Sequence, residues 1–339
     1  MEQFRDAHYF YIPSQGNIYT MTDLKLANGS TKLLVASLKR EIFCFEYQES
    51  PTGSLVPTTK EVSFTYIPNG AEIISLDAFN KSSINNEFVI GITIIKNSND
   101  SDTLETYLNI YSEWEESEDF DIENIAQNCL NVELSFIPYK LLHTFLVTWQ
   151  DENISSKEIV FILSGSDCQV HIYREHSSDH VYKEMENKDY FPEFIKTPSP
   201  VVWIDIYYTD DYTDNVLEFG LSDYATLPRL DSTSILTCCE IADIDFDGQK
   251  EILIGNSAEE IMLLKRDKER GWCLEELKKI AAPILSLRYL DISGDGVKEL
   301  VVLSMKGVHV LQHDFNCLQN VLDSKIQSLT LPNITDLKL

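Results

Sequence analysis

The chain has 339 residues, of which 43% are hydrophobic and 24% are charged, so it can bury a large core. Acidic residues outnumber basic ones by 55 to 27, and a formal net charge of −28 makes free nucleic acid and anionic membrane surfaces poor partners, since both need a cationic face. The seven cysteines include no CxxC pair, which fits reduced thiols in the cytosol. The first residues show no secretory signal, and the chain has no long apolar run. We therefore expect a cytoplasmic protein with no transmembrane segment.

One strand pattern repeats along the chain. An apolar strand ends near an Asp, a loop follows, a charged residue opens a second apolar strand, and a short turn leads to a third. The first copy predicts strands at residues 17–23, 33–37 and 42–47. The next two copies predict them at 72–77, 88–93 and 108–112, and at 141–149, 159–164 and 169–173. Two later copies predict strands at 235–243, 252–256 and 260–265, and at 284–291, 300–304 and 308–312.

The copies are spaced as the blades of a β-propeller are, by roughly 50 to 70 residues. We therefore expect an all-β protein, a propeller of the seven-bladed type, spanning residues 1–313. Residues 8–12 are expected to supply the outer strand of the last blade. Residues 314–339 are expected to form a C-terminal tail with a short helix, because Cys317, Val321, Ile326 and Leu329 have loose helical spacing.

The fourth copy is irregular. Strands are expected at residues 201–205 and 216–222, but only about a dozen residues then precede the next blade. About one and a half blades are therefore expected to be missing or compressed after residue 222. A splice form, an incomplete gene model and a compressed natural variant would each explain this.

Two loops share the form D-x-[DS]-x-D-G-x-x-E and lead directly into a strand. The candidate metal ligands in these loops are Asp243, Asp245, Asp247, Glu251, Asp291, Ser293, Asp295 and Glu299. Oxygens at such spacing can converge on a hard cation such as Ca²⁺, as in the integrin-type FG-GAP propeller repeats that the loops resemble. Asp side chains also hold tight turns by accepting backbone N–H groups. We favour turns without a cofactor, with Ca²⁺ binding as the alternative.

Features that would indicate catalysis are few. The sequence has no Gly-rich phosphate loop, GxSxG elbow or CxxC metal pair. His176 and His180 lie in a polar stretch that reads best as a solvated loop, and His309 and His313 lie beside one strand. The four Trp residues are dispersed, as expected of packing residues, and the acidic run at 113–123 predicts a solvated loop or a docking patch for a basic partner. We expect no enzyme activity.

Four segments resemble the kaptin family of animal proteins. They are residues 64–82, 125–138, the Asp243 loop, and residues 305–313, and the resemblance runs in order from about residue 14 to residue 313. This chain differs from the family in two ways. The family has a longer chain, with the difference falling at the irregular fourth copy, and its basic C-terminal tail is replaced here by a nearly neutral one.

The resemblance implies a non-catalytic scaffold subunit of the KICSTOR complex. Such a subunit pairs with a second FG-GAP-type propeller subunit and docks on a very large scaffold subunit. The complex holds the GATOR GTPase-activating complex at the lysosomal surface and restrains amino-acid-dependent TOR signalling. The resemblance also implies binding to actin filaments in lamellipodia and stereocilia. An actin-associated cytoskeletal protein and a Ca²⁺-dependent ligand-binding propeller are therefore the alternatives.

Overall fold

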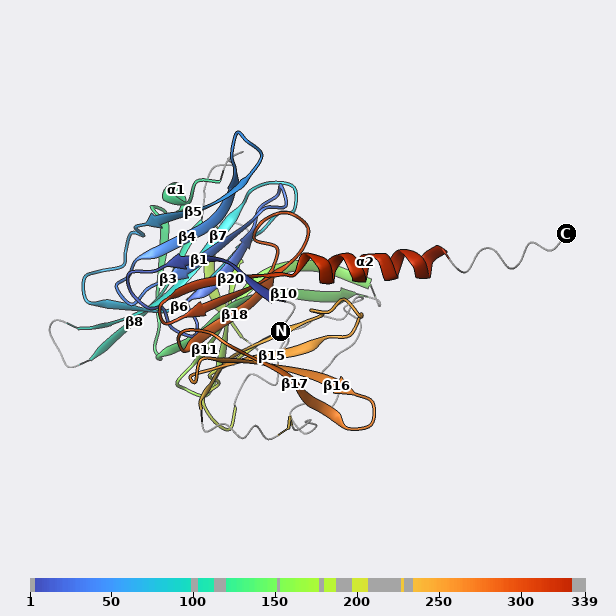
Figure 1. The fold of residues 1–339 in the computed structure, drawn as a ribbon. Coiled ribbons are helices and arrows are strands. Elements are labelled where there is room, and N and C mark those ends of the chain that lie inside the picture. Colours follow the sequence, from blue (N-terminus) through green and yellow to red (C-terminus); the bar gives the residue numbers. More distant parts are fainter. Residues whose placement is uncertain are drawn as a thin grey trace. The chain divides into compact units, whose positions relative to one another are not determined.

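A computed structural model describes residues 4–98, 103–112, 120–150, 153–176, 180–186, 197–206, 227–228 and 234–330. The strands of this described part form five four-stranded antiparallel sheets (Figure 1). The chain divides into two compact units, which are described separately. The first unit comprises residues 14–226 with 292–294, and the second comprises 1–13, 227–291 and 295–339.

The first unit contains three sheets, each built from four consecutive strands. The first sheet has β2 (Met21–Lys25), β3 (Thr31–Ala36), β4 (Ile42–Glu49) and β5 (Leu55–Val62). The second has β6 (Ala71–Asn80), β7 (Phe88–Asn97), β8 (Leu104–Ser112) and β9 (Cys129–Glu133), and the third has β10 (Pro138–Gln150), β11 (Asn153–Gly165), β12 (Val170–His176) and β13 (Val181–Met185). A short helix, α1 (Ile122–Ile125), begins after Asp121, whose carboxylate accepts the Glu123 and Asn124 N–H groups.

Neighbouring sheets of the first unit pack face to face, which explains the continuous apolar runs in their middle strands. Phe79 and Val89 of the second sheet share a core with Leu141 and Phe161 of the third. The approach is closest at Gly91, where an added Cβ would lie 2.8 Å from Leu141 Cδ2. A strand covered on both faces needs apolar residues at every position rather than at every second one.

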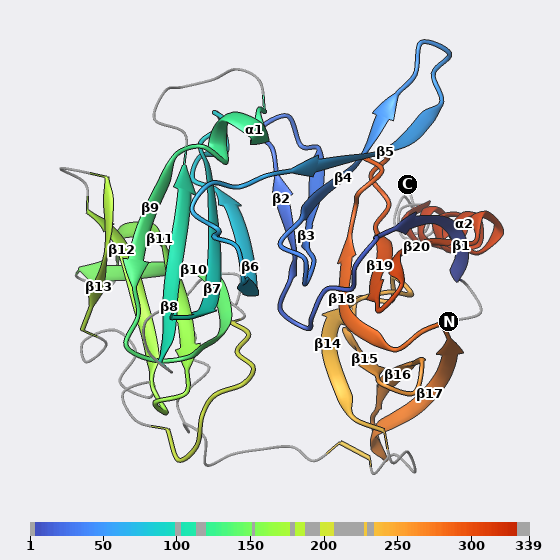
Figure 2. The same ribbon diagram turned by 90° about the vertical axis from the view of Figure 1, so that its left-hand side faces the viewer.

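The second unit contains the other two sheets (Figure 2). One has β14 (Leu236–Ala242), β15 (Glu251–Asn256), β16 (Glu260–Asp267) and β17 (Gly271–Lys279). The other has β18 (Ile284–Leu290), β19 (Glu299–Ser304) and β20 (Gly307–His313), with β1 (Phe4–Tyr11) as its outer strand. The last sheet thus joins the two ends of the sequence, since Phe4 pairs with His313 and Tyr11 with Gly307.

The helix α2 (Phe315–Thr330) follows β20 directly and extends away from the sheet of the second unit to which β20 belongs (Figure 1). The prediction of an all-β propeller fold with a short C-terminal helix is confirmed. Its five described sheets are propeller blades of four antiparallel strands each. Among the described helices, none is long and apolar enough to cross a membrane.

The irregular fourth copy differs from the prediction where it is described. Residues 201–206 form no strand, so the strand predicted at 201–205 is wrong. Instead Ile204 is buried against Ile162 and Val170 of the third sheet. The segment is apolar because it covers this sheet face, and burial of this kind requires no pairing with another strand. The strand predicted at 216–222 lies outside the described residues.

Candidate functional site

The first acidic loop is the connection between β14 and β15. One carboxylate oxygen from each of Asp243, Asp245 and Asp247 lies within 4.8 Å of the others. The Asp247 N–H donates to Asp243 Oδ1 and to Asp245 Oδ1, both at 3.1 Å, and the Gly248 N–H donates to Asp243 Oδ2 at 3.0 Å. The carboxylates therefore accept the N–H groups that the tight turn leaves without a strand partner. Gly248, with φ of +89°, occupies a backbone conformation that favours glycine.

Glu251 begins β15 and lies beneath this loop. Its side chain is only 2% exposed, and its Oε2 accepts the Ile244 N–H at 2.8 Å. Burial raises the pKa of Glu251, while the bond from the Ile244 N–H opposes the shift. Lys265 of β16 forms an ion pair with Asp245. Burial alone would lower the pKa of Lys265, but the hydrogen bond and charge of Asp245 outweigh it and raise the pKa.

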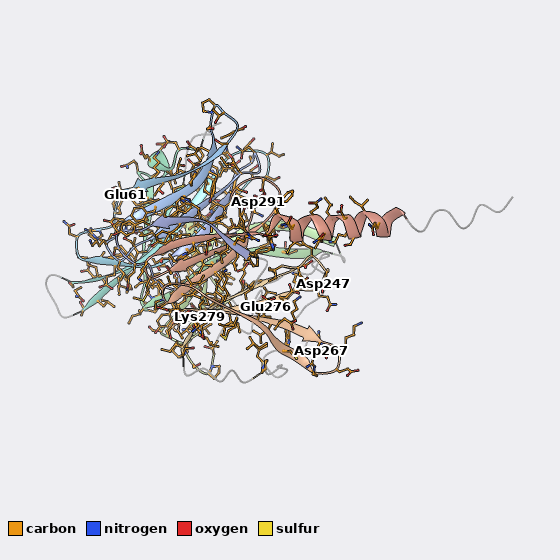
Figure 3. The ribbon with its side chains drawn as sticks, viewed as in Figure 1. Glu61, Asp247, Asp267, Glu276, Lys279 and Asp291 are labelled. Atoms are coloured by element: carbon orange, nitrogen blue, oxygen red, sulfur yellow. The ribbon has the colours of Figure 1, made fainter. Side chains whose placement is uncertain are left out.

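The second acidic loop connects β18 to β19 and repeats this arrangement. Asp291, Asp295 and Glu299 bring one carboxylate oxygen each within 4.8 Å of the others. Asp291 Oδ2 accepts the Gly296 N–H at 2.9 Å, as Asp243 does for the equivalent Gly248. Glu299, at the first residue of β19, is 1% exposed and accepts from Gln312 Nε2 at 3.2 Å. Figure 3 labels Asp247 in the first loop and Asp291 at the start of the second.

The two loops offer oxygen ligands of the kind that Ca²⁺ prefers, but six to eight of them are needed around the ion. Each loop gathers three carboxylates, and in the first loop both Asp243 oxygens already accept backbone N–H groups. Ser293, the remaining candidate ligand, is buried in the second loop. Glu251 and Ser293 lie outside the two groups of three carboxylates that the loops bring together. The sequence also did not indicate that Lys265 would pair with Asp245.

The histidines singled out in the sequence have structural partners. His313 is buried, with its Nε2 2.8 Å from the Tyr289 hydroxyl and its ring 4.3 Å from that of Phe4. His180 Nδ1 lies 3.1 Å from Glu175 Oε1. His171 lies between Asp167 and Glu184, at 3.0 and 2.7 Å, and stacks on Phe136. Burial opposes the protonation of His171, but the two carboxylates outweigh it and raise its pKa.

The helix α2 presents an apolar stripe, although the apolar residues of this segment have only loose helical spacing in the sequence. Phe315, Leu322 and Ile326 are 75%, 58% and 50% exposed. A pocket of about 620 Å³ lies where Phe315, Leu318 and Leu322 face the end of the last sheet at Val297 and Gln312. Exposed apolar residues at helical spacing are typical of a surface that another chain can cover.

Comparison with solved structures gives weak similarity. Two crystal structures of BBS1N in complex with ARL6DN, soaked with mercury and with lead, align with 93% and 92% of this chain and with 98% and 96% of theirs. Both have a TM-score of 0.43 and a sequence identity of 10%. At this level the similarity carries no conclusion about what the present chain binds.

Comparison with known sequences is more specific. The KICSTOR complex protein kaptin of Mus musculus is 30% identical over 378 residues, which cover 88% of this chain and 86% of the mouse protein. The aligned length exceeds the 339 residues of this chain, so the mouse protein has residues without a counterpart here. The family model for KICSTOR complex protein kaptin matches residues 4–215 and 212–323, two stretches that overlap at residues 212–215. The chain therefore belongs to the family of KICSTOR complex protein kaptin.

Proposed function

We propose that this chain is a non-catalytic scaffold subunit of the KICSTOR complex. The observation that carries this proposal is the match to the family of KICSTOR complex protein kaptin over residues 4–323. The fold supports it, because four-stranded blades present flat faces, loops and short outer strands to other proteins. The described clusters of titratable residues hold turns and strands together, which suits a scaffold.

In this role the chain pairs with a second FG-GAP-type propeller subunit and with a very large scaffold subunit, and the assembly recruits the GATOR complex to lysosomes. The chain then acts at the lysosomal surface as a negative regulator of amino-acid-dependent TOR signalling. A net charge of −28 favours partners with basic or apolar surfaces and opposes direct binding to other strongly acidic proteins. This electrostatic cost is why we place actin-filament binding second.

The proposal is tested in cells that lack their own kaptin-family protein. The tagged chain should co-purify with the other KICSTOR subunits, and TOR kinase activity should again fall when amino acids are withdrawn. The full-length mouse protein is the positive control. A chain that is folded and abundant in these cells, but neither enters the complex nor restores the response to starvation, would contradict the proposal.

Direct actin binding has a separate test. The purified chain is sedimented with actin filaments across a series of salt concentrations. The scaffold proposal expects the chain to stay in the supernatant even at low salt, where electrostatic attraction would be strongest. Pelleting that saturates with filament concentration would instead support the cytoskeletal role.

A further inference from the structure

Three Ser or Thr residues of this chain stand directly before a proline, namely Ser50, Thr197 and Ser199. A proline in that position selects the acceptor sites of proline-directed protein kinases, because a residue without an N–H leaves no donor unpaired in an apolar kinase pocket. The three sites carry the same local signal in the sequence. The structure separates them, since a kinase transfers phosphate only to a hydroxyl that it can reach.

The Ser50 hydroxyl is held inside the turn between β4 and β5. Its Oγ accepts the Thr52 and Ser54 N–H groups at 3.3 and 3.2 Å and lies 2.8 Å from the hydroxyl oxygen of each. The Ser50 N–H also donates to the Ser54 carbonyl at 2.8 Å, and the Ser50 carbonyl accepts the Gly53 N–H at 2.9 Å. A kinase would therefore have to open the turn before it could use this hydroxyl.

The Thr197 hydroxyl is also engaged. Thr197 is half-buried, and both its N–H and its hydroxyl lie 3.0 Å from the Cys168 carbonyl, which accepts them. The same hydroxyl lies 2.5 Å from the Ser199 carbonyl. These bonds fix the beginning of the segment at residues 197–206 to the turn between β11 and β12, so Thr197 serves as an anchor.

Ser199 follows this anchor and is exposed. A second anchor comes after it, where the Tyr19 hydroxyl donates to the Val202 carbonyl at 2.5 Å. Between the two anchors, residues 198–200 are exposed and belong to no helix or strand. Within the described part of the chain the Ser199 hydroxyl makes no hydrogen bond, and the Ser199 carbonyl accepts only the Thr197 hydroxyl. Ser199 therefore has the most accessible hydroxyl of the three candidate acceptors.

The prolines on either side of Ser199 suit this exposure. Pro198 and Pro200 have no N–H, so an exposed stretch without strand partners leaves fewer donors unpaired. Each proline restricts its own φ, and Pro200 also disfavours the helical region for Ser199. A backbone of limited freedom thus presents the hydroxyl, and less conformational entropy is lost when a kinase binds it.

We propose that Ser199 is a phosphorylation site for a proline-directed Ser/Thr protein kinase. Ser199 Oγ bonds to the γ-phosphorus of ATP, the bond from that phosphorus to the β,γ-bridging oxygen breaks, and ADP leaves. The hydroxyl proton passes to the catalytic carboxylate of the kinase. The product carries about 1.5 to 2 additional negative charges at neutral pH. Because the Ser199 side chain makes no bond to the rest of the described protein, the phosphate marks the surface and leaves the fold unchanged.

Phosphate transfer to the purified full chain tests the site. The folded chain is incubated with Mg-ATP and a cyclin-dependent kinase, and the modified residue is located by tandem mass spectrometry of proteolytic peptides. We expect phosphate at Ser199, with about tenfold less at Thr197 and at Ser50. If the folded chain carries no phosphate at Ser199, whether the phosphate lies elsewhere or reaches Ser199 only in a chain denatured beforehand, the inference is overturned. The purified chain suffices, so this outcome is independent of the scaffold proposal.

Matched variants separate the acceptor from the proline that follows it. Ser199→Ala removes the acceptor, whereas Pro200→Ala keeps the hydroxyl and restores an N–H after it. Each should lower the incorporated phosphate by about tenfold. Ser50→Ala and Pro51→Ala are the same two changes in the β4–β5 turn and should leave the incorporation unchanged. Equal incorporation in Ser199→Ala and the wild type would exclude Ser199 as the acceptor.

Two further measurements address the consequence. The tagged chain isolated from proliferating animal cells should yield the Ser199 phosphopeptide, and Ser199→Ala should not. The melting temperatures of the phosphorylated and unmodified chains should be equal. Absence of the phosphopeptide from the wild-type chain in cells would overturn the assignment of the site, and a lower melting temperature after phosphorylation would contradict a surface mark that leaves the fold unchanged.

Discussion

His143 Nδ1 on β10 lies 2.8 Å from Asp77 Oδ2 on β6. The other oxygen of the same carboxylate accepts the Thr22 hydroxyl of β2 at 3.1 Å. Asp77 is 6% exposed, so one buried carboxylate links the first strands of all three sheets in the first unit. A backbone bond from the Leu76 N–H to the Tyr19 carbonyl and a hydrogen bond from the Leu141 N–H to the Ser75 hydroxyl also join these strands.

We expect Asp77→Ala to lower the free energy of unfolding by about 1–3 kcal/mol, because the buried Thr22 hydroxyl and the His143 ring lose their shared acceptor. The measurement is urea unfolding followed by tryptophan fluorescence. Glu72→Ala, an exposed carboxylate on the same strand, is the matched control and should change stability by no more than about 0.5 kcal/mol. Equal effects of the two substitutions would show that Asp77 does not hold the three sheets together.

The buried His313 predicts a loss of stability in mild acid. Burial lowers the pKa of His313 from 6.5 to about 4, so the folded protein keeps this ring neutral while the unfolded chain takes up a proton. Its contribution is complete above pH 6.5 and is lost as the pH falls from there towards 4. The expected loss over this interval is about 2–3 kcal/mol.

The difference between the wild type and His313→Gln isolates this effect, since all other titrating groups are common to both. The stability advantage of the wild type should shrink by that amount between pH 7 and pH 4, measured by urea unfolding at each pH. A difference that is constant with pH, or one that grows in acid, would mean that His313 is not held neutral beside Tyr289.

Close packing between the two sheets of the second unit gives a third prediction. A Cβ at Gly255 would lie 2.6 Å from Cys238 Sγ and 2.7 Å from Ile284 Cγ2, so an added methyl group would clash with both side chains. Gly255→Ala should therefore lower the free energy of unfolding by about 1–3 kcal/mol. Removing the sulfur in Gly255→Ala/Cys238→Ala should restore part of this loss, which thermal unfolding of the single and double variants would measure. Strictly additive losses would argue against the steric cause.

Whether a strand could be predicted from the sequence depends on how that strand is buried. The runs at residues 252–256 and 300–304 became β15 and β19 because strands covered on both faces carry uninterrupted apolar residues. The outer strand β17 was not predicted, because its residues are half-exposed or exposed and several are charged, as in a loop. Residues 201–205 have the same apolar character as a strand, yet they cover a sheet face without pairing.

For the candidate site, the sequence predicted contacts between residues of the same loop but not contacts between different strands. Positions 1, 3 and 5 of the first loop converge because the turn at Gly248 folds them onto one side. The pairing of Lys265 with Asp245 depends on the register of β15 with β16, which spacing in the sequence does not reveal.

The last prediction concerns the acidic loops, which we propose act as turns without a metal ion. Asp243→Ala removes the acceptor of the Gly248 N–H and one of the two acceptors of the Asp247 N–H, so the free energy of unfolding should fall by about 1–2 kcal/mol. Asp243→Asn keeps one acceptor oxygen and should lose less. If the loops are turns, the melting temperature of the wild type should be the same in EDTA and in millimolar Ca²⁺, and titration calorimetry should show no heat of binding. A melting temperature that rises with Ca²⁺ in the wild type but not in Asp243→Ala would assign the carboxylates to a cation instead, because a ligand that binds only the folded state stabilises it more as the ligand concentration rises above its Kd.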